Sequence, residues 1–394
     1  MTFFASALLG FAQVLIWGGS FFLLSVLAAP IHADTGWSLT GIYGALTLGV
    51  LVSAVLSPQA SVYIARGHGR RVLVVSAWLV SIGLAMLAAA PNFGVFLLGW
   101  VVIGVGMAGG LYDPLFATLG TQLGGQARRA ILAVTLIAGF ATTITWPILA
   151  WLEHQLGWRL TCVVSGAVLA AAIGPLYWRA LPPPAKPASA PVSESSPATR
   201  PAVRPADLGL EPAVYWLLTV VFSLAAILMT AVSVQIVVLL QGVGHDLTSA
   251  IALAALIGPS MVAMRLLNLA LGDLDAVRMA VASTAAVAIG LLVISVAPAA
   301  AMVGIVAYGL GNGLRALVRG TLPLVMVPAS SYALLMGKLA RSSLFCQALT
   351  PLAGGFVLSQ WGPGVTLWVL ALLALMNAGL SVLLVQRIRR SRPQ

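Results

Sequence analysis

The sequence predicts an all-α integral membrane protein in which twelve transmembrane helices form two related groups of six. Three observations lead to this prediction. The chain of 394 residues is 60% hydrophobic and only 7% charged, which is too apolar for a water-soluble domain. Apolar runs of about 20 residues recur along the chain, and each can cross a hydrocarbon layer about 30 Å thick as a helix. A polar segment also separates two halves of nearly equal length.

The apolar runs define the predicted spans. The sequence has no series of alternating ten-residue strands of the kind that a transmembrane barrel needs. The first run is too long for a signal-peptide core and lacks a basic start, so we expect a retained helix. The predicted spans are 6–30, 38–64, 71–90, 93–120, 127–152, 158–180, 211–241, 246–271, 275–297, 299–326, 334–358 and 363–386.

The segment LPPPAKPASAPVSESSPATRPAVRPAD, residues 181–207, divides these spans into six and six. It contains eight prolines together with alanine and serine. This composition cannot build a hydrophobic core and favours a linker. The sequence therefore predicts an N-terminal six-helix bundle over 1–180, a cytoplasmic linker over 181–207 and a C-terminal six-helix bundle over 208–394.

The basic residues predict the orientation of the chain. Sixteen of the twenty Lys and Arg residues fall in alternate loops and in the C-terminal tail, whereas the opposite loops hold acids and one basic residue, Arg159. The positive-inside rule then places both termini in the cytoplasm, which predicts a multi-pass protein of a bacterial inner membrane. These loops also account for the net charge of +11, so nucleic acid is not a predicted partner.

The two halves repeat one another. VVIGVGMAGGLYDPLF in the fourth span matches IVAYGLGNGLRALVRG in the tenth when Gly104 is aligned with Gly309. The alignment brings Asp113 within one position of Arg319. A six-helix duplication with a polar central linker is typical of secondary transporters.

The loop after the second span carries a family motif. Its sequence VYIARGHGRR, residues 62–71, is similar to the G-x-x-x-D-R-x-G-R-R motif of the major facilitator superfamily. Gly69, Arg70 and Arg71 match, whereas Val62 replaces the first glycine of the motif and Arg66 stands where the motif has its acid. The chain resembles this superfamily over essentially its full length. The resemblance implies two pseudo-symmetric six-helix bundles that work by alternating access, and a conformational role for Gly69, Arg70 and Arg71.

A narrower resemblance concerns the monocarboxylate and oxalate/formate branch of the superfamily. The stretch TGWSLTGIYGALTLGVLVSAVLSP, residues 35–58, is similar to that branch's loop and second span. MVAMRLLNLALGD in the eighth span resembles the segment whose arginine binds the substrate carboxylate, which implies this role for Arg265. Met261 replaces the acid of that branch, so its proton-carrying role is not transferred. Trp100 replaces an arginine that is typical of multidrug antiporters.

Four ionisable side chains lie inside predicted spans, where facing lipid would cost each of them about 2.5–3.5 kcal/mol. They are Asp113, Arg265, Arg315 and Arg319. Asp113 and Arg319 fall at similar depth, so a pair between the bundles is plausible. Arg315 and Arg319 are four residues apart and share one helical face. Guanidinium groups bind carboxylates bidentately, so the positive excess favours a small organic anion as substrate.

Two other roles stay open for these charges. Asp113 and Arg319 can form a gate latch that never touches substrate, and Arg265 can also act in a latch. Arg315 can extend to the membrane surface. Asp113 is also the only acid deep in a span, because all four histidines fall in loops or at span ends. If an anion takes Arg319, the freed carboxylate can take a proton. The sequence therefore predicts proton coupling, with exchange for a counter-anion as the alternative.

Polar and aromatic side chains complete the predicted substrate site. In the first span, small residues next to Trp17 allow either a bend that exposes aromatic rings to a cavity or ordinary close packing between helices. Pro114 can kink the fourth span. The residues predicted to contact substrate, besides the three arginines, are Gln13, Trp17, Tyr112, Gln235, Tyr308 and Asn312.

The sequence contains no P-loop, metal-ligand cluster or nucleophile–base motif. We therefore predict neither an enzyme nor a bound metal or cofactor. The predicted partners are a small anionic solute, protons or a counter-anion, and the lipid bilayer, with the protein acting as a monomer. Two alternatives remain. One is proton-driven efflux of amphipathic drugs or toxic compounds, which the aromatic first span favours, and the other is a membrane sensor that transports nothing.

Overall fold

The computed structural model describes residues 2–181, 208, 210–270 and 275–390, and the regular structure in these residues is helical. Seven helical stretches of the described chain are long and apolar enough to cross a membrane. Several of them contain bends that merge two rods into one stretch. The all-helical membrane fold is thus confirmed, whereas the predicted linker lies outside the described residues except for Leu181.

The helices before the linker alternate long rods with short segments. They are α1 (Phe3–Gly18), α2 (Leu24–Thr35), α3 (Leu39–Tyr63), the π-helical turn η1 (Ile64–His68), α4 (Gly69–Ala89), α5 (Phe93–Gly110), α6 (Tyr112–Leu123), the 3-10 turn η2 (Gly124–Gln126), α7 (Ala127–Ala138) and α8 (Ala141–Ala180). After the linker come α9 (Pro212–Gly242), α10 (Leu247–Ala255), α11 (Ile257–Ala270), α12 (Ala276–Val296), the 3-10 turn η4 (Pro298–Ala300), α13 (Ala301–Leu324) and α14 (Ala329–Arg390).

Local sequence signals set several helix ends. The Ser38 hydroxyl accepts the backbone N–H of Gly41 at 3.1 Å, and the Asn92 side chain accepts that of Val95 at 3.0 Å. Both are N-caps that satisfy a donor left unpaired in the first turn. Gly36 follows α2 with φ of 70°, a left-handed conformation that glycine adopts without strain.

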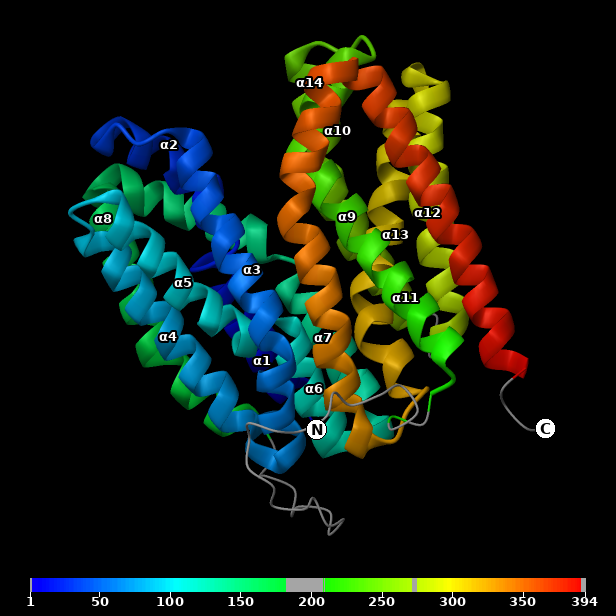
Figure 1. Cartoon of the computed structure of the whole chain (residues 1–394), viewed down its shortest axis with the longest axis horizontal. Coiled ribbons are helices and arrows are strands. Elements are labelled where there is room, and N and C mark those ends of the chain that lie inside the picture. The colour runs from blue at the N-terminus through cyan, green and yellow to red at the C-terminus, as the bar shows by residue number, and fades with distance from the viewer. Residues whose placement is uncertain (1, 182–207, 209, 271–274, 391–394) are drawn as a thin grey trace.

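Two glycines reverse the chain inside the longest helical stretches. Gly157 within α8 has φ of 74°, and Gly362 within α14 has φ of 77°. Both have non-helical backbone angles, so each stretch is two rods joined at a bend. Figure 1 shows the orange first rod of α14 and its red second rod running in opposite directions. The predicted boundaries between spans at 152–158 and 358–363 fall at these bends.

Helices α1–α8 gather on one side of the molecule and α9–α14 on the other (Figure 1). On the first side α5 packs against α3 and α4, and on the second side α13 packs against α11 and α12. The aligned glycines occupy matching contacts. A Cβ on Gly104 would lie 2.4 Å from the Gly49 carbonyl of α3, and one on Gly309 would lie 2.6 Å from Cβ of Ser260 of α11. The sequence repeat therefore marks equivalent close helix crossings.

Gly104→Ala is expected to destabilise the protein. The added Cβ would lie 2.4 Å from Gly49 O, and neither backbone can yield without moving α3 from α5. Overpacking of this kind costs about 1–3 kcal/mol, which exceeds the gain of at most about 1 kcal/mol from replacing a helical glycine by alanine. Thermal unfolding in detergent measures the effect. Gly379→Ala is the matched control, since an added Cβ there meets nothing within 4 Å, and equal midpoints for the two variants would contradict this packing.

The two sides are in contact through α3, α6 and α7 of the first and α11, α13 and α14 of the second. Gly120 of α6 lies against the Tyr332 ring of α14, and Gly337 of α14 lies against Ser61 of α3. Gly320 of α13 lies against Phe116 of α6. These contacts cluster near η1 and η2, so the two sides are packed together at that end of the molecule.

Candidate functional site

A break in the helix places Asp113 in the interior. The chain breaks between α5, which ends at Gly110, and α6, which begins at Tyr112. Pro114 has no N–H to donate to the Gly110 carbonyl, its helical partner. The side-chain amide of Gln13 donates to that carbonyl instead, at 2.9 Å. Asp113 consequently lies in the first turn of α6, where the helix N-terminus stabilises a negative charge.

Asp113 forms a bidentate ion pair with Arg319 of α13. Arg319 Nε lies 2.5 Å from Asp113 Oδ1, and Nη2 lies 2.7 Å from Oδ2. The two side chains are only 12% and 14% exposed, so water screens the pair weakly. The pair links the first side of the molecule to the second, at the end where the two sides are packed together.

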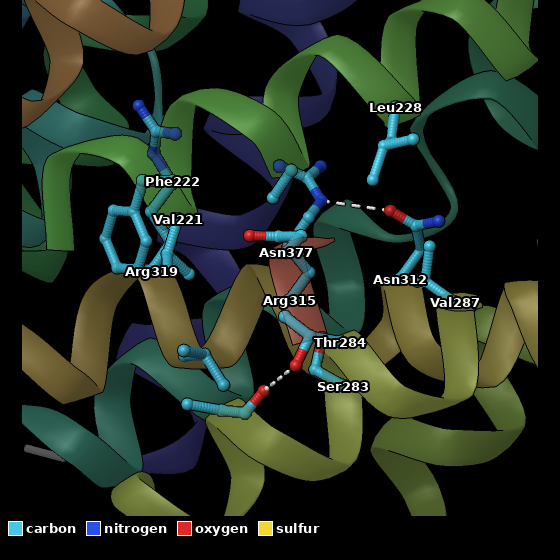
Figure 2. Close-up of a pocket in the computed structure, with 13 residues that line it drawn as sticks. Val221, Phe222, Leu228, Ser283, Thr284, Val287, Asn312, Arg315, Arg319 and Asn377 are labelled. Atoms are coloured by element: carbon cyan, nitrogen blue, oxygen red, sulfur yellow. Dashed lines mark hydrogen bonds between the residues drawn. The ribbon is translucent and has the colours of Figure 1, made fainter. Parts of the chain in front are cut away.

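Arg315 lies one turn before Arg319 and lines the same cavity. Its Nε donates to Asn312 Oδ1 at 3.0 Å, and its Nη2 contacts the sulfur of Met229. The cavity lies between α9, α12, α13 and α14, and Figure 2 shows the side chains around it. Arg315 therefore points into the protein and does not extend to the membrane surface. The cavity measures about 30 Å³, room for about one or two water molecules.

Arg265 of α11 reaches across to the first side. Only 2% of the residue is exposed. Its Nη1 donates to the Thr135 carbonyl near the end of α7 at 2.6 Å, and its Nε donates to the Gly313 carbonyl at 3.4 Å. The Thr135 carbonyl also accepts the backbone N–H of Gly139 at 2.9 Å, and carbonyls at the C-terminal end of a helix carry partial negative charge. Arg265 thus caps α7 from the opposite side, with Gly139 packed against its guanidinium.

The site carries a surplus of positive charge. Arg315 is close enough to Arg265 and Arg319 to interact electrostatically with both. Within the described ranges, Asp113 is the one acid that pairs with any of these three arginines. The interior therefore holds three guanidinium groups against one carboxylate.

Aromatic rings adjoin this charged cluster. The Trp17 ring lies 5.2 Å from the Tyr112 ring, and Tyr112 stacks on Phe116 at 5.4 Å. The Tyr112 hydroxyl is within electrostatic range of Arg265 and Arg315. The Gln13 carbonyl oxygen accepts the indole N–H of Trp17 at 3.2 Å. Gln13 is fully buried. Its two hydrogen bonds stabilise the break between α5 and α6 and orient the Trp17 indole.

The remaining predicted residues lie at different distances from the charges. Asn312 lines the cavity, and the Tyr308 hydroxyl interacts electrostatically with Arg315. Gln235 lies apart from them, buried between α9 and α14 with its amide against Gly354. Of the predicted site residues, Gln235 is thus the one placed outside the cluster.

Sequence reasoning missed three contributors to the cluster. Asn377 of α14 lines the cavity, is 2% exposed, and has no hydrogen-bond partner for its carbonyl oxygen among the described residues. An amide in an apolar span is itself a signal, so Asn377 was detectable. Thr135 and Gly139 could not be predicted from the sequence. Thr135 contributes a backbone carbonyl, and Gly139 contributes only the absence of a side chain, which leaves room for Arg265.

The motif at residues 62–71 lies at the end where the two sides meet. Gly67 has φ of 86°, and Gly69 packs directly against Thr118 of α6. Arg70 donates to the Leu181 carbonyl at 2.6 Å and lies over the Trp178 ring at 5.0 Å, which ties α4 to the end of α8. Arg71 is exposed.

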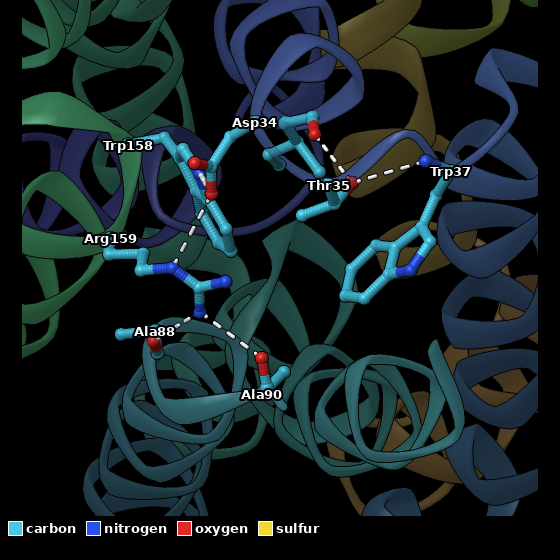
Figure 3. A network of polar contacts seen from close by, with 8 residues as sticks. Asp34, Thr35, Trp37, Ala88, Ala90, Trp158 and Arg159 are labelled. Atoms are coloured by element: carbon cyan, nitrogen blue, oxygen red, sulfur yellow. Dashed lines mark hydrogen bonds and ion pairs between the residues drawn. The ribbon is translucent and has the colours of Figure 1, made fainter. Parts of the chain in front are cut away.

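Arg159 holds together the opposite end of the first side (Figure 3). Its Nη1 donates to the carbonyls of Ala88 at 2.9 Å and Ala90 at 3.1 Å, which caps α4. Asp34 of α2 lies 3.6 Å from Arg159 Nε and accepts the indole N–H of Trp158 at 2.9 Å. Arg159, the one basic residue in the loops predicted to face away from the cytoplasm, therefore has a local structural role.

The fold and its buried charges define a polytopic α-helical membrane protein with an interior polar site. The family model described as the Major Facilitator Superfamily matches residues 9–337, and the chain belongs to this superfamily. Members of this superfamily are in general transporters and not enzymes. The predicted superfamily is therefore confirmed.

Two curated relatives match parts of the chain. The transcription regulatory protein OpdE of Pseudomonas aeruginosa is 30% identical over 185 residues, which is 45% of this chain and 43% of OpdE. A chloramphenicol efflux pump of Mycobacterium tuberculosis is 32% identical over 126 residues, which is 31% of this chain and 30% of the pump. The chain thus spans less than half the length of the curated relatives it matches.

Two solved structures share the fold over almost the whole chain. The human organic anion transporter MFSD10 (TETRAN) has a TM-score of 0.72 at 14% identity, covering 97% of this chain and all of that one. The proton:xylose symporter XylE has a TM-score of 0.72 at 10% identity, covering 95% of this chain and 94% of that one. At such identities the likeness concerns the fold alone.

Proposed function

We propose that the protein is a secondary active transporter that moves a small organic anion bearing a carboxylate across the bacterial inner membrane. It works as a monomer by alternating access, and transport is coupled to protons or to exchange for another anion. The observation that carries this proposal is the excess of three buried guanidinium groups over one carboxylate. Buried charges persist when they are paired, and an anionic substrate would supply the missing partner.

We also infer that the helices form twelve spans in two six-helix bundles, over 1–180 and 208–394. The bends at Gly157 and Gly362 support this count, because each divides one long stretch into two rods. The breaks between α1 and α2, between α5 and α6, between α7 and α8, and between α10 and α11 then lie within single spans. Both termini and the linker 181–207 are cytoplasmic in this proposal.

The proposed mechanism centres on Arg319. In this conformation the Asp113 carboxylate accepts from two N–H groups of Arg319, and the pair helps to hold the two sides together. A substrate carboxylate offers the same bidentate geometry and competes for the guanidinium. The freed Asp113 then takes a proton, so that anion and proton cross together. Gly69, Arg70 and Arg71 support the contacts that change as the bundles rock.

Arg265 supports the resemblance to carboxylate-binding members of the superfamily. Its present partners are two neutral backbone carbonyls. A carboxylate carries a full negative charge and can accept two parallel N–H bonds from one guanidinium, which a neutral carbonyl cannot, so a substrate carboxylate can displace them. The small cavity beside Arg315 implies that the solute enters in a more open conformation.

A ligand screen by thermal shift tests the charge of the substrate. A ligand that binds the native protein raises its apparent stability, by about 2.7 kcal/mol at 100 times its dissociation constant. We expect stabilisation by acetate, benzoate and other carboxylates, but not by uncharged sugars or lipophilic cations. Stabilisation by lipophilic cations alone would contradict the proposal. Choline chloride at equal ionic strength is the control for salt effects.

A second candidate function is the efflux of amphipathic compounds. The aromatic cluster around Trp17 favours it, as does the partial likeness to a chloramphenicol efflux pump. Trp100 opposes it, because this fully buried side chain replaces the arginine typical of multidrug antiporters. The other alternative is a membrane sensor that transports nothing, and the partial likeness to a protein named as a transcription regulator favours it. Such a sensor would show no flux of any solute.

A further inference from the structure

We propose that the transported anion has a planar aromatic body, which binds against the rings of Trp17, Phe21, Phe22 and Tyr112, while its carboxylate binds the guanidinium groups of Arg265 and Arg315. We call these four rings the aromatic wall. The inference rests on the proposed function, because it names the substrate class for the same site.

The aromatic wall is built from a break in the first span. Helix α1 ends at Gly18 and α2 starts at Leu24, and the intervening turns carry two phenylalanines. The Trp17 ring lies 5.5 Å from Phe21, 5.4 Å from Phe22 and 5.2 Å from Tyr112. Phe22 also meets Trp146 of α8 edge to face at 6.4 Å. The rings thus form one continuous surface across α1, α6 and α8.

The aromatic wall and Gly19 make different contacts within the first side. A Cβ added to Gly19 would meet Leu169 of α8 at 2.6 Å and Leu84 of α4 at 3.3 Å. Helix α1 and its continuation therefore contact α4 and α8 through Gly19, and α6 and α8 through the rings. All four rings are only half-buried, so part of each ring remains free to contact a solute.

Tyr112 joins the aromatic wall to the charged cluster. Its ring lies 5.2 Å from the Trp17 ring and 5.4 Å from the Phe116 ring, and Phe116 lies against the glycine that follows Arg319. The residue after Tyr112 is Asp113, which pairs with Arg319. A solute with an aromatic ring next to its carboxylate can therefore contact the rings of the first side and the guanidinium groups of the second. An aliphatic carboxylate would use the charges alone.

Gln13 is a positioning residue for the aromatic wall. Its amide nitrogen donates to the Gly110 carbonyl, and its amide oxygen accepts the Trp17 indole N–H. These two bonds fix the indole plane relative to the break that carries Tyr112. Ring contacts depend on orientation and contribute about 0.5–1.5 kcal/mol beyond the area they bury, which is roughly a twofold to twelvefold change in affinity.

Binding of matched carboxylates to the purified full-length protein tests the inference. Benzoate, cyclohexanecarboxylate and acetate carry the same charge but differ in their ring. We expect benzoate to bind wild-type protein at least about tenfold more tightly than acetate and about threefold more tightly than cyclohexanecarboxylate. Trp17→Leu should weaken benzoate binding about tenfold and leave acetate binding within about twofold. Trp78→Leu is the control, since Trp78 is 51% exposed on α4.

The possible outcomes separate this inference from the proposed function. If wild-type protein binds acetate, cyclohexanecarboxylate and benzoate equally, the aromatic wall does not select substrate, although the anion site stands. If Trp17→Leu weakens acetate and benzoate alike, the loss is structural and the inference is wrong. If wild-type protein binds none of the three anions, the proposed function fails as well. The wild-type comparison needs no variant, so misfolding of Trp17→Leu cannot obscure it.

Discussion

Asp113→Asn abolishes uphill accumulation of the transported anion but leaves exchange across the membrane measurable. Asparagine keeps the size of aspartate and one acceptor for Arg319, but it cannot gain or lose a proton in the physiological range. The anion can still bind and cross, yet the proton gradient no longer drives it. We expect the accumulation ratio in proteoliposomes with an imposed pH gradient to fall to about one, while counterflow of labelled anion continues.

Two comparisons make this result specific. Glu153→Gln removes a carboxylate outside the charged cluster and should leave accumulation unchanged. The loss of charge at Asp113 also leaves Arg319 buried and uncompensated, which can cost about 3–5 kcal/mol, so unfolding must be measured beside transport. Asp113→Glu retains the charge and the proton site and should recover part of the accumulation. Accumulation by Asp113→Asn at the wild-type level would show that Asp113 carries no coupling proton.

Gly139→Ala displaces Arg265 from the end of α7 and lowers the transport rate at least about tenfold. An added Cβ would lie 2.1 Å from Arg265 Nη1, and the long side chain moves more readily than the backbone. The glycine has φ of −62° and ψ of −23°, so alanine fits the local conformation. The displaced guanidinium loses its bond to the Thr135 carbonyl, and a buried cation left without partners is strongly unfavourable.

A double-mutant cycle shows whether the effect passes through Arg265. In an Arg265→Gln background the added methyl group has no guanidinium to displace, so Gly139→Ala should change transport less than twofold. Interaction between contacting residues appears as such non-additivity. Gly174→Ala serves as control, because a Cβ there meets nothing within 4 Å. If Gly139→Ala behaves like wild type, or reduces transport equally in both backgrounds, the capping contact is not required for transport.

The charged cluster was predictable because an ionisable group in an apolar span has few places to lie. The internal repeat set Asp113 within one position of Arg319, and the four-residue spacing put Arg315 beside it. The structure brings all three together with Arg265. The membrane fold was equally predictable from the sequence, since the length of an apolar run determines whether a helix can cross the membrane. The glycine repeat also marked real helix crossings, at Gly104 and Gly309.

The less predictable features depend on backbone atoms and on distant partners. Gln13 is predicted to contact substrate, and the structure adds a contact that the sequence does not indicate, with the Gly110 carbonyl that Pro114 leaves unpaired. Nothing in the sequence connects residues 97 positions apart. Arg265 was identified by its charge, yet its partners are the carbonyls of Thr135 and Gly313, which any residue type would supply. Periodicity and charge therefore indicate which side chains face inward, but not which of them form hydrogen bonds to backbone carbonyls.

Counterflow exchange of labelled carboxylates tests the central claim most directly, namely that the buried guanidinium cluster transports an organic anion. Proteoliposomes with wild-type protein or Arg319→Gln are loaded with unlabelled acetate or benzoate, and uptake of the labelled anion is followed, with tetraphenylphosphonium as the cationic comparison. The variant is compared at equal amounts of folded protein. We predict saturable carboxylate exchange in wild type and a loss of at least about tenfold in Arg319→Gln. Saturable transport of the cation without carboxylate exchange would contradict the account.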